Sequence, residues 1–443
     1  MAKKINQVKE DKLARKRQVY LISIPLIALL IKVIIMANIK AGAWLGADGE
    51  NYLKGVEGLQ IAGFFSNEPK LSFWPAGYPL LMWPFSEITI NYFFYIITFA
   101  QSLFFAYATY YFSKEVSRSP ISKFAIISSL FISFNPTLSL GTLAIGYESP
   151  IAACFLMVLG LSFKFVSANN IDSKKLLVLL AQISGWFALM IFMQPRFLLV
   201  AIIFIIILSF KTGGNRLRLK LISIGLIVVL TSPAILIFRN YEVIGEATIS
   251  NNLGVTMAIG AGPETSGGYA HTGPDVPCDS GTPGVATTDD QKVKCVLGWY
   301  LKNPIETLRL SYNKSKFFWS PWSGPLAAGT MARNPWLKIA PAYTVMKNEE
   351  GSNLVLGPFG KFVSYLWIFG QVTALLFGAL YLARRGRVEK FYSILLSTPV
   401  LISWLISIGT IGDHRFRVPT MSLSLVLQAI AFKTLSEKIS RAT

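Results

Sequence analysis

Long runs of apolar residues recur along the whole chain, and they constrain the fold more than any other feature. A helix of about 20 apolar residues crosses a bilayer. Only 15% of the residues are charged, whereas roughly 25% is typical of soluble proteins. The sequence therefore predicts an all-α polytopic membrane protein with about ten transmembrane helices. The predicted spans are 19–38, 91–112, 123–139, 149–167, 176–193, 197–210, 221–238, 361–382, 391–411 and 418–433.

The distribution of lysine and arginine predicts the orientation of these spans. Basic residues are enriched in loops on the cytoplasmic side of a membrane. Here they gather in segments that all face one side when the N-terminus is cytoplasmic: 1–18, 114–123, 164–175, 211–220, 384–390 and 433–443. We therefore expect a multi-pass protein of the cytoplasmic (inner) membrane. The net charge of +19 then reflects loops that face anionic membrane lipids, and no nucleic-acid partner is expected.

The same topology divides the chain into five parts. A basic cytoplasmic tail (1–18) precedes an N-terminal transmembrane module (19–238), whose first outer loop spans 39–90. An extracytoplasmic cap (239–360), C-terminal helices (361–433) and a cytoplasmic tail (434–443) follow.

Within the first outer loop, apolar residues at helical spacing predict an interfacial helix over 50–62. Three prolines in "FWPAGYPLLMWPF" then predict a fixed turn without a regular helix. The cap combines a loop-like stretch, which is a lid candidate, with "NPIETLRLSYNKSKFFW", which has helical spacing. Cys278 and Cys295 both lie in the cap, where an oxidising compartment permits a disulfide; two free thiols are the alternative.

Two carboxylates follow the first span. Asp48 and Glu50 lie at the start of the predicted helix, in "LGADGENYLKG". Asp48 can serve as an N-cap, with Glu50 favourably placed near the positive end of the helix. The other interpretation is a general base at the membrane surface that takes a proton from an acceptor hydroxyl.

A charged cluster marks the last outer connection, "GDHRFRVP". His414, Arg415 and Arg417 lie together where basic residues are disfavoured. Arginine suits phosphate contact, although pairing with Asp413 or with lipid headgroups also explains the cluster. Glu148 and Arg196 also lie at outer ends of spans, where charge is a functional indicator or forms a structural Glu148–Arg196 pair. No spacing indicates a metal site, and no cofactor is certain.

Seven motifs in order resemble the type C membrane glycosyltransferases, in the branch of protein O-mannosyltransferases and aminoarabinose transferases. The motifs are the acid pair, "FWPAGYPLL", "GYES", "QPRFLL", "RNYEVIGEATISNNLGVTMAIGAGPETSGGY", "NPIETLRLSYNKSKFFW" and "DHRFRVP". The resemblance covers about residues 44–430. It implies a sugar donor carried on polyprenyl phosphate and a lipid, glycan or protein acceptor on the extracytoplasmic side.

The resemblance also implies roles for single residues. It assigns the catalytic acid to Asp48, with Glu50 beside it. It also leads us to expect a strand-like conformation for "GVTMAIGAGP". The candidates for the donor phosphate are Arg415, Arg417, His414 and Arg239. Those for the substrate are Tyr52, Tyr78, Glu148 and Arg196. Asp48 and Glu50 can also share a divalent ion with the leaving phosphate.

The expected reaction is an inverting transfer in which Asp48 deprotonates the acceptor hydroxyl. One rival is an O-antigen polymerase or ligase, which relies on His414 and Arg415 and should tolerate Asp48→Asn. A lipid or sugar transporter is the second rival. Such proteins often contain two related halves and broken spans, and neither feature is clear in this sequence.

Overall fold

The computed structural model describes residues 2–38, 48–88, 92–167, 172–262, 265–268, 278, 288–321 and 357–442. These residues form helices and the turns between them, with no strand among their elements, which confirms the all-α prediction. The long bundle is made of α1 (Ala2–Ala37), α5 (Phe93–Ser117), α6 (Ala125–Phe134), α7 (Pro136–Leu140), α8 (Glu148–Ser167), α9 (Ser173–Met193), α10 (Leu198–Ser209), α11 (Asn215–Ile244), α17 (Pro358–Ala383), α18 (Arg387–Gly409) and α19 (Val418–Ala442).

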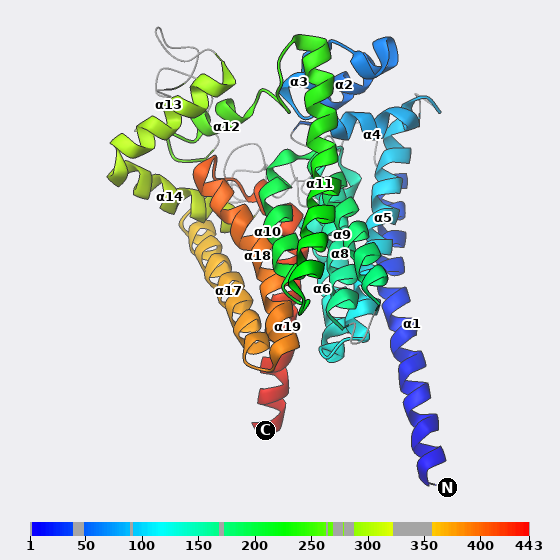
Figure 1. The fold of residues 1–443 in the computed structure, drawn as a ribbon. Helices are drawn as coiled ribbons and strands as arrows, with labels where there is room; N and C mark the ends of the chain where they lie inside the picture. Colours follow the sequence, from blue (N-terminus) through cyan, green and yellow to red (C-terminus); the bar gives the residue numbers. More distant parts are fainter. Residues whose placement is uncertain are drawn as a thin grey trace.

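Shorter helices cover one end of this bundle. They are α2 (Gly49–Ala62), α3 (Lys70–Phe73) and α4 (Gly77–Ser86) from the first loop, and α12 (Leu253–Ile259), α13 (Asp289–Lys302) and α14 (Pro304–Trp319) from the cap. Both chain termini lie at the opposite end (Figure 1). We call the two ends the loop end and the terminal end.

Eight helices of the described residues are long and apolar enough to cross a membrane, or nine if one bent pair is a single span. The eight coincide with eight of the ten predicted spans. The predicted span 123–139 is the bent pair Ser122–Phe134 and Pro136–Leu143, which turns by 56°. The predicted span 197–210 forms α10, whose 12 residues fall short of the length that a span needs.

The predicted division of the 176–210 run is confirmed. Helix α9 ends at Met193, the 3-10 turn η4 (Pro195–Phe197) follows, and α10 begins at Leu198. Proline is tolerated at such a start because its missing N–H would have no helical partner there.

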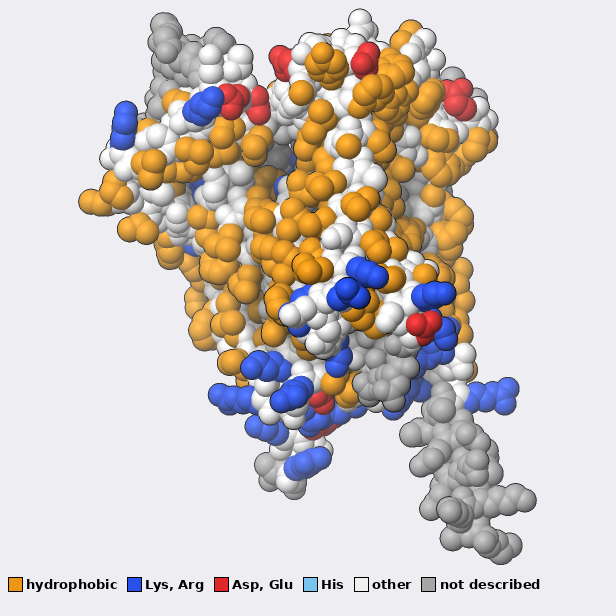
Figure 2. Space-filling view, in the orientation of Figure 1, with side chains coloured by type: hydrophobic (Ala, Val, Ile, Leu, Met, Phe, Trp, Pro, Cys, Tyr) orange, Lys and Arg blue, Asp and Glu red, His pale blue; other side chains and the backbone are white. Residues whose placement is uncertain are grey.

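The centre of the bundle is α8, which is almost wholly buried and packs against α5, α9 and α19. Figure 2 shows hydrophobic side chains over the middle of the visible face, with lysine and arginine gathered toward the terminal end. This distribution is typical of a helical membrane protein with one basic end.

Two local predictions are wrong. Residues 77–86 form the regular helix α4, although a turn without helix was expected over 73–85. Pro79 lies in the first turn of α4, where no intrahelical N–H donor is needed, and Pro84 lies within the last turn of this short helix. The stretch expected to be strand-like contains α12, which packs against α13. Its short apolar run fits a buried helix as well as a strand.

The other loop predictions fall partly within and partly outside the described residues. The interfacial helix expected over 50–62 is α2, and the helical spacing of 303–319 is α14. Helix α11 continues to Ile244, five residues past the predicted start of the cap at 239. Most of the lid candidate lies outside the described residues.

Candidate functional site

Four helix starts bring charged side chains together at one site. Asp48 directly precedes α2, and Glu148 is the first residue of α8. Arg196 lies in η4 before α10, and Arg415 lies in the 3-10 turn η7 (His414–Phe416) before α19. The four residues come from distant parts of the sequence. The proposed site is therefore a product of the helix packing.

Arg415 joins the two carboxylates. Its Nη1 donates to Asp48 Oδ2 at 2.5 Å, and its Nε donates to Glu148 Oε1. The Arg415 side chain is 10% exposed, whereas those of Asp48 and Glu148 are 22% and 16% exposed. Burial opposes the charge on Arg415, but the two carboxylates outweigh it and hold the pKa of Arg415 well above its usual range. The acids are thus fixed by a buried cation and remain accessible.

Asp48 does not act as a helix cap. It occupies the N-cap position of α2, yet its side chain makes no capping hydrogen bond to that helix. Its carboxylate instead binds Arg415, which lies 367 residues further along the chain. Of the two sequence interpretations of Asp48, the geometry therefore favours a role in the site. Glu50 is exposed in the first turn of α2.

Tyr147 lies beside two guanidinium groups. The Cζ atoms of Arg415 and Arg196 lie 5.2 Å and 5.6 Å from the centre of its ring. Such contacts stabilise a cation through the negative face of the ring. Burial raises the pKa of the Tyr147 hydroxyl, so this residue contributes a neutral surface that holds both arginines.

Arg196 has unused hydrogen-bonding capacity. Its Nη1 and Nη2 atoms are buried and have no hydrogen-bond partner. Its Cζ lies 4.2 Å from the ring centre of Phe416 and 5.1 Å from that of Phe197. A guanidinium that is held by rings and lacks acceptors is costly, and an anionic ligand would supply those acceptors. The alternative Glu148–Arg196 pair is not among the ion pairs of the described residues; Glu148 pairs with Arg415.

Asp413 and His414 support the Arg415 turn from within. Asp413 Oδ1 accepts the backbone N–H of Arg415 at 3.0 Å and lies 3.4 Å from His414 Nδ1. Burial raises the pKa of Asp413 to about 7 and lowers that of His414 to about 3. His414 is fully buried. It therefore lies within the protein and does not face the open side of the site.

Arg417 binds protein groups. It donates to the carbonyls of Trp319 and Ser320 at 3.1 and 3.2 Å, and to Gln371 Oε1 at 2.6 Å. Burial lowers its pKa to about 9. These contacts join the end of α14, the middle of α17 and the turn before α19, so Arg417 has a structural role, and its predicted phosphate contact stays a prediction.

Arg239 is likewise committed to the protein. Its guanidinium donates to the carbonyls of Phe64, Ser66 and Leu71 at 3.0, 2.5 and 3.2 Å. A further bond of 2.8 Å reaches Asn240 Oδ1. Arg239 therefore fastens the first loop to the end of α11, and its predicted phosphate contact stays a prediction.

Tyr52 and Tyr78 lie beneath the acids. Both rings are buried and meet edge to face, with centres 5.1 Å apart. The Tyr78 hydroxyl donates to Gln101 Oε1 at 2.9 Å and accepts from Gly146 N at 3.0 Å. Burial, and then the charge of Asp48, raise the pKa of Tyr52 well above its usual value. These tyrosines therefore shape the floor of the site, and direct substrate contact stays a prediction.

The cap contains a disulfide between Cys278 and Cys295. Cys278 packs in a small buried cluster with Met257, Ala258 and Val296. The bond therefore ties the described part of the Cys278 segment to α12 and α13, within the cap.

The charged site does not fit a metal ion in this arrangement. Arg415 already places a cation between the Asp48 and Glu148 carboxylates. Over the described ranges, no group of three or more His, Cys, Asp or Glu side chains could hold a metal. The predicted sharing of a divalent ion by Asp48, Glu50 and the leaving phosphate has only two protein ligands, and we derive no step through a metal.

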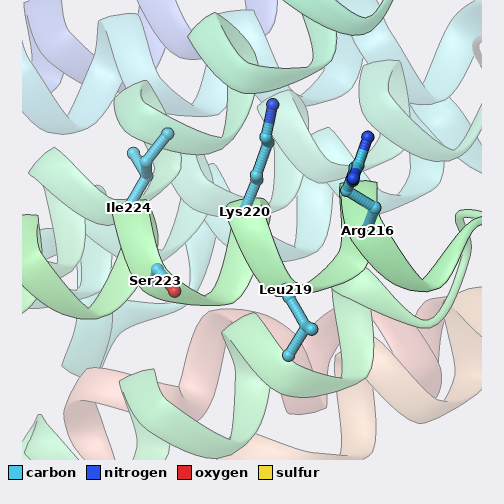
Figure 3. Close-up of a pocket in the computed structure, with 5 residues that line it drawn as sticks. All are labelled: Arg216, Leu219, Lys220, Ser223 and Ile224. Atoms are coloured by element: carbon cyan, nitrogen blue, oxygen red, sulfur yellow. The ribbon is translucent and has the colours of Figure 1, made fainter.

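A separate groove lies toward the terminal end of α11. It measures about 510 Å³ and is lined by Arg216, Leu219, Lys220, Ser223 and Ile224 (Figure 3). These residues precede Arg239 by about four to six turns of the same helix. The groove is therefore distinct from the charged site at the loop end.

Sequence reasoning missed Tyr147 and Phe416 as parts of the site. Each is the immediate neighbour of a predicted charged residue, in "GYES" and "DHRFRVP". Their position in the sequence could have indicated them, because an aromatic ring next to a functional arginine or acid is well placed to hold a cation.

Comparisons with known proteins give structural neighbours only. No protein-family model matches the chain, and no curated protein matches it. Among solved structures, it resembles the archaeal oligosaccharyltransferase AglB from Archaeoglobus fulgidus in complex with an inhibitory peptide and a dolichol-phosphate. The TM-score is 0.49 at 13% identity, over 96% of this chain and 51% of that one.

A second structure of the Archaeoglobus fulgidus oligosaccharyltransferase is tethered to an acceptor peptide. It gives a TM-score of 0.48 at 15% identity, over 95% of this chain and 50% of the other. A third, a complex with zinc and sulfate, gives 0.48 at 13% identity over 94% and 49%. This chain thus spans about half the length of the structures it resembles. At such values the likeness carries no argument about activity, which must be argued from the residues of the site.

Proposed function

We propose that this protein is an inverting membrane glycosyltransferase that moves a sugar from a polyprenyl-phosphate carrier to a hydroxyl acceptor. The acceptor is a lipid, a glycan or a protein. The observation that carries the proposal is the Asp48–Arg415–Glu148 arrangement, in which the Asp48 side chain does not cap α2 and instead binds a buried arginine. An acid and guanidinium groups in one accessible site supply the two functions that the reaction needs.

The reaction needs a base and a group that stabilises a leaving phosphate. Asp48 accepts the proton of the acceptor hydroxyl while the oxygen of that hydroxyl forms a bond to the anomeric carbon. The bond from that carbon to the phosphate oxygen breaks, and polyprenyl phosphate leaves with the electron pair. Positive charge placed where the phosphate becomes more negative lowers the barrier.

Arg196 and Arg415 divide the contacts to phosphate. The unpartnered Nη atoms of Arg196 are ready to donate to a phosphate oxygen. When phosphate also binds Arg415, that guanidinium gains an alternative partner to Asp48, and the Asp48 carboxylate is freed to act as the base. The start of α8 adds favourable potential for an anion.

The side of the membrane follows from the basic residues. They gather toward the terminal end (Figure 2), which the positive-inside rule assigns to the cytoplasm. The site at the loop end then faces outward. Nucleotide sugars are cytoplasmic, so an outward site requires a membrane-carried donor.

One rival is less well supported by the structure, and the other is separated by experiment. A polymerase or ligase would use His414, but that side chain is fully buried and its pKa lies near 3. A transporter would move its substrate without breaking the bond from sugar to phosphate. Release of sugar from the lipid therefore separates transfer from transport.

The proposal is tested with the full chain in proteoliposomes and radiolabelled polyprenyl-phosphate sugars. We expect the wild type to remove label from the lipid when a membrane extract supplies acceptors. We expect Arg196→Gln to weaken binding of polyprenyl phosphate at least tenfold, since a hydrogen bond to a charged group contributes about 1.5–3 kcal/mol. Arg216→Gln, at the exposed end of α11, serves as the control and should bind normally. Failure of the wild type to consume any donor in a panel of lipid sugars would refute the proposal.

A further inference from the structure

The last carbonyl groups of α18 face the cap. The final carbonyls of any helix lack partners within that helix, and here α18 leads directly toward η7. The carbonyls of Ile408 and Thr410 accept hydrogen bonds from Lys314 Nζ at 3.1 and 2.7 Å. The carbonyl of Gly409 accepts from the Tyr300 hydroxyl at 3.4 Å. Three consecutive carbonyls are therefore bound by two side chains of the cap.

Lys314 is fully committed to these contacts. It lies on α14, is only 1% exposed, and also donates to the Tyr300 hydroxyl at 2.7 Å. Its ammonium has three hydrogens, and three acceptors surround it. Burial lowers the pKa of Lys314 to about 7, so a buried ammonium is costly here. A cation at the carboxyl end of a helix offsets part of that cost.

The backbone segments around Lys314 are so closely packed that they have no room to shift relative to one another. A Cβ added to Gly412 would lie 2.4 Å from Lys314 Cα, and one added to Gly260 would lie 2.2 Å from the Thr410 carbonyl oxygen. Gly412 N also donates to the carbonyl of Gly267 at 2.8 Å. The cap therefore holds residues 408–412 through side chains and backbone together.

Residues 408–412 directly precede the part of the chain that carries Arg415. The chain continues from Gly412 into Asp413, whose carboxylate fixes the backbone N–H of Arg415. We propose that Lys314 is a positioning residue for Arg415, because it joins cap helix α14 to the carbonyl end of α18 and so sets where Arg415 meets Asp48. The catalytic consequence rests on the proposed function, whereas the structural consequence does not.

The structural consequence is tested by hydrogen exchange on the full chain in nanodiscs. Lys314→Met removes all three donors and keeps most of the side-chain volume. We expect amides 408–417 to exchange at least about tenfold faster, because two buried carbonyls lose their donor. Lys316→Met is the matched control. It lies on the same helix, and its ammonium is placed over the Tyr312 ring at 4.9 Å. Unchanged exchange at 408–417 in folded Lys314→Met would overturn the inference.

A second variant covers the case in which Lys314→Met fails to fold. Tyr300→Phe removes only the hydroxyl that Lys314 and Gly409 share. It should produce a smaller increase in exchange, confined to the same amides. Normal exchange there, when Lys314→Met does not fold, would show that Lys314 is needed for folding alone and would overturn the positioning role.

The catalytic consequence is tested by combining variants. We expect Lys314→Met to lower kcat about tenfold with little change in KM, since a small misplacement of a catalytic group is costly. In an Arg415→Lys background, Lys314→Met should cause little further loss. An equal loss in both backgrounds would mean that Lys314 does not act through Arg415. If even the wild type transfers no sugar, the proposed function fails, and the exchange data still decide the structural inference.

Discussion

At the scale of single residues, the central feature is that one guanidinium serves two carboxylates. The sequence indicated Asp48, Glu148 and Arg415 as charges at the outer ends of helices. It could not show that Glu148 pairs with Arg415 and not with Arg196, because that choice depends on how each helix is rotated about its axis. Breaking a buried ion pair from one side costs about 3–5 kcal/mol. Substitution of Arg415 should therefore affect both stability and activity.

The buried neighbours Asp413 and His414 should titrate in opposite directions. The folded-state pKa of Asp413, about 7, lies above its unfolded value, so folding stability falls as pH rises from about 4 to 7. That of His414, about 3, lies below its unfolded value, so stability rises between about pH 3 and 6.5. The two effects oppose each other between about pH 4 and 6.5, and they cancel in the wild type.

Removing either group should reveal the other. In Asp413→Asn the melting temperature should rise with pH from 4 to 6.5, and in His414→Gln it should fall, each by comparison with the wild type. The limiting slope is about 1.4 kcal/mol per pH unit for one proton. Thermal unfolding in detergent across this range measures the effect. Identical pH dependence in all three proteins would contradict the assigned shifts.

At the scale of elements, apolar periodicity predicted the long helices well and the loop elements less well. Helix α2 and the break at Pro195 follow from residue spacing and proline placement. Helix α4 was missed because Pro79 lies in a first helical turn, where proline is allowed. Helix α12 was missed because its seven residues carry too little periodicity to separate helix from strand. Its packing against α13 decides the outcome.

Arg239 attaches the first loop to α11, and this link between elements can be tested. Arg239→Met leaves the carbonyls of Phe64, Ser66 and Leu71 without this donor inside the protein. We expect the local free energy of opening over residues 63–73 to fall by about 3 kcal/mol, measured by hydrogen exchange. Arg216→Met, on the same helix but exposed at its other end, should leave that region unchanged. Equal exchange in the two variants would argue against the role of Arg239.

At the scale of the whole molecule, the positions of the basic residues and of the two termini mark the same end of the bundle. Both termini lie at one end of the bundle, and lysine and arginine gather toward that end (Figures 1 and 2). The chain brings the starts of α2, α8, α10 and α19 together at the other end, through residues that begin these helices or directly precede them. Sequence could predict that these starts share one side of a membrane. It could not predict which of them touch, because that depends on the packing order around the buried helix α8.

The central claim is that Asp48, held by Arg415, is the base of a sugar transfer. The most direct measurement compares initial rates of transfer from radiolabelled polyprenyl-phosphate sugar by wild type, Asp48→Asn and Glu50→Gln in proteoliposomes. Loss of a general base typically lowers the rate by about 10²–10⁴-fold. We predict a loss of that size for Asp48→Asn, with donor binding retained, and near-normal rates for the exposed Glu50→Gln. Wild-type rates in Asp48→Asn would contradict the account.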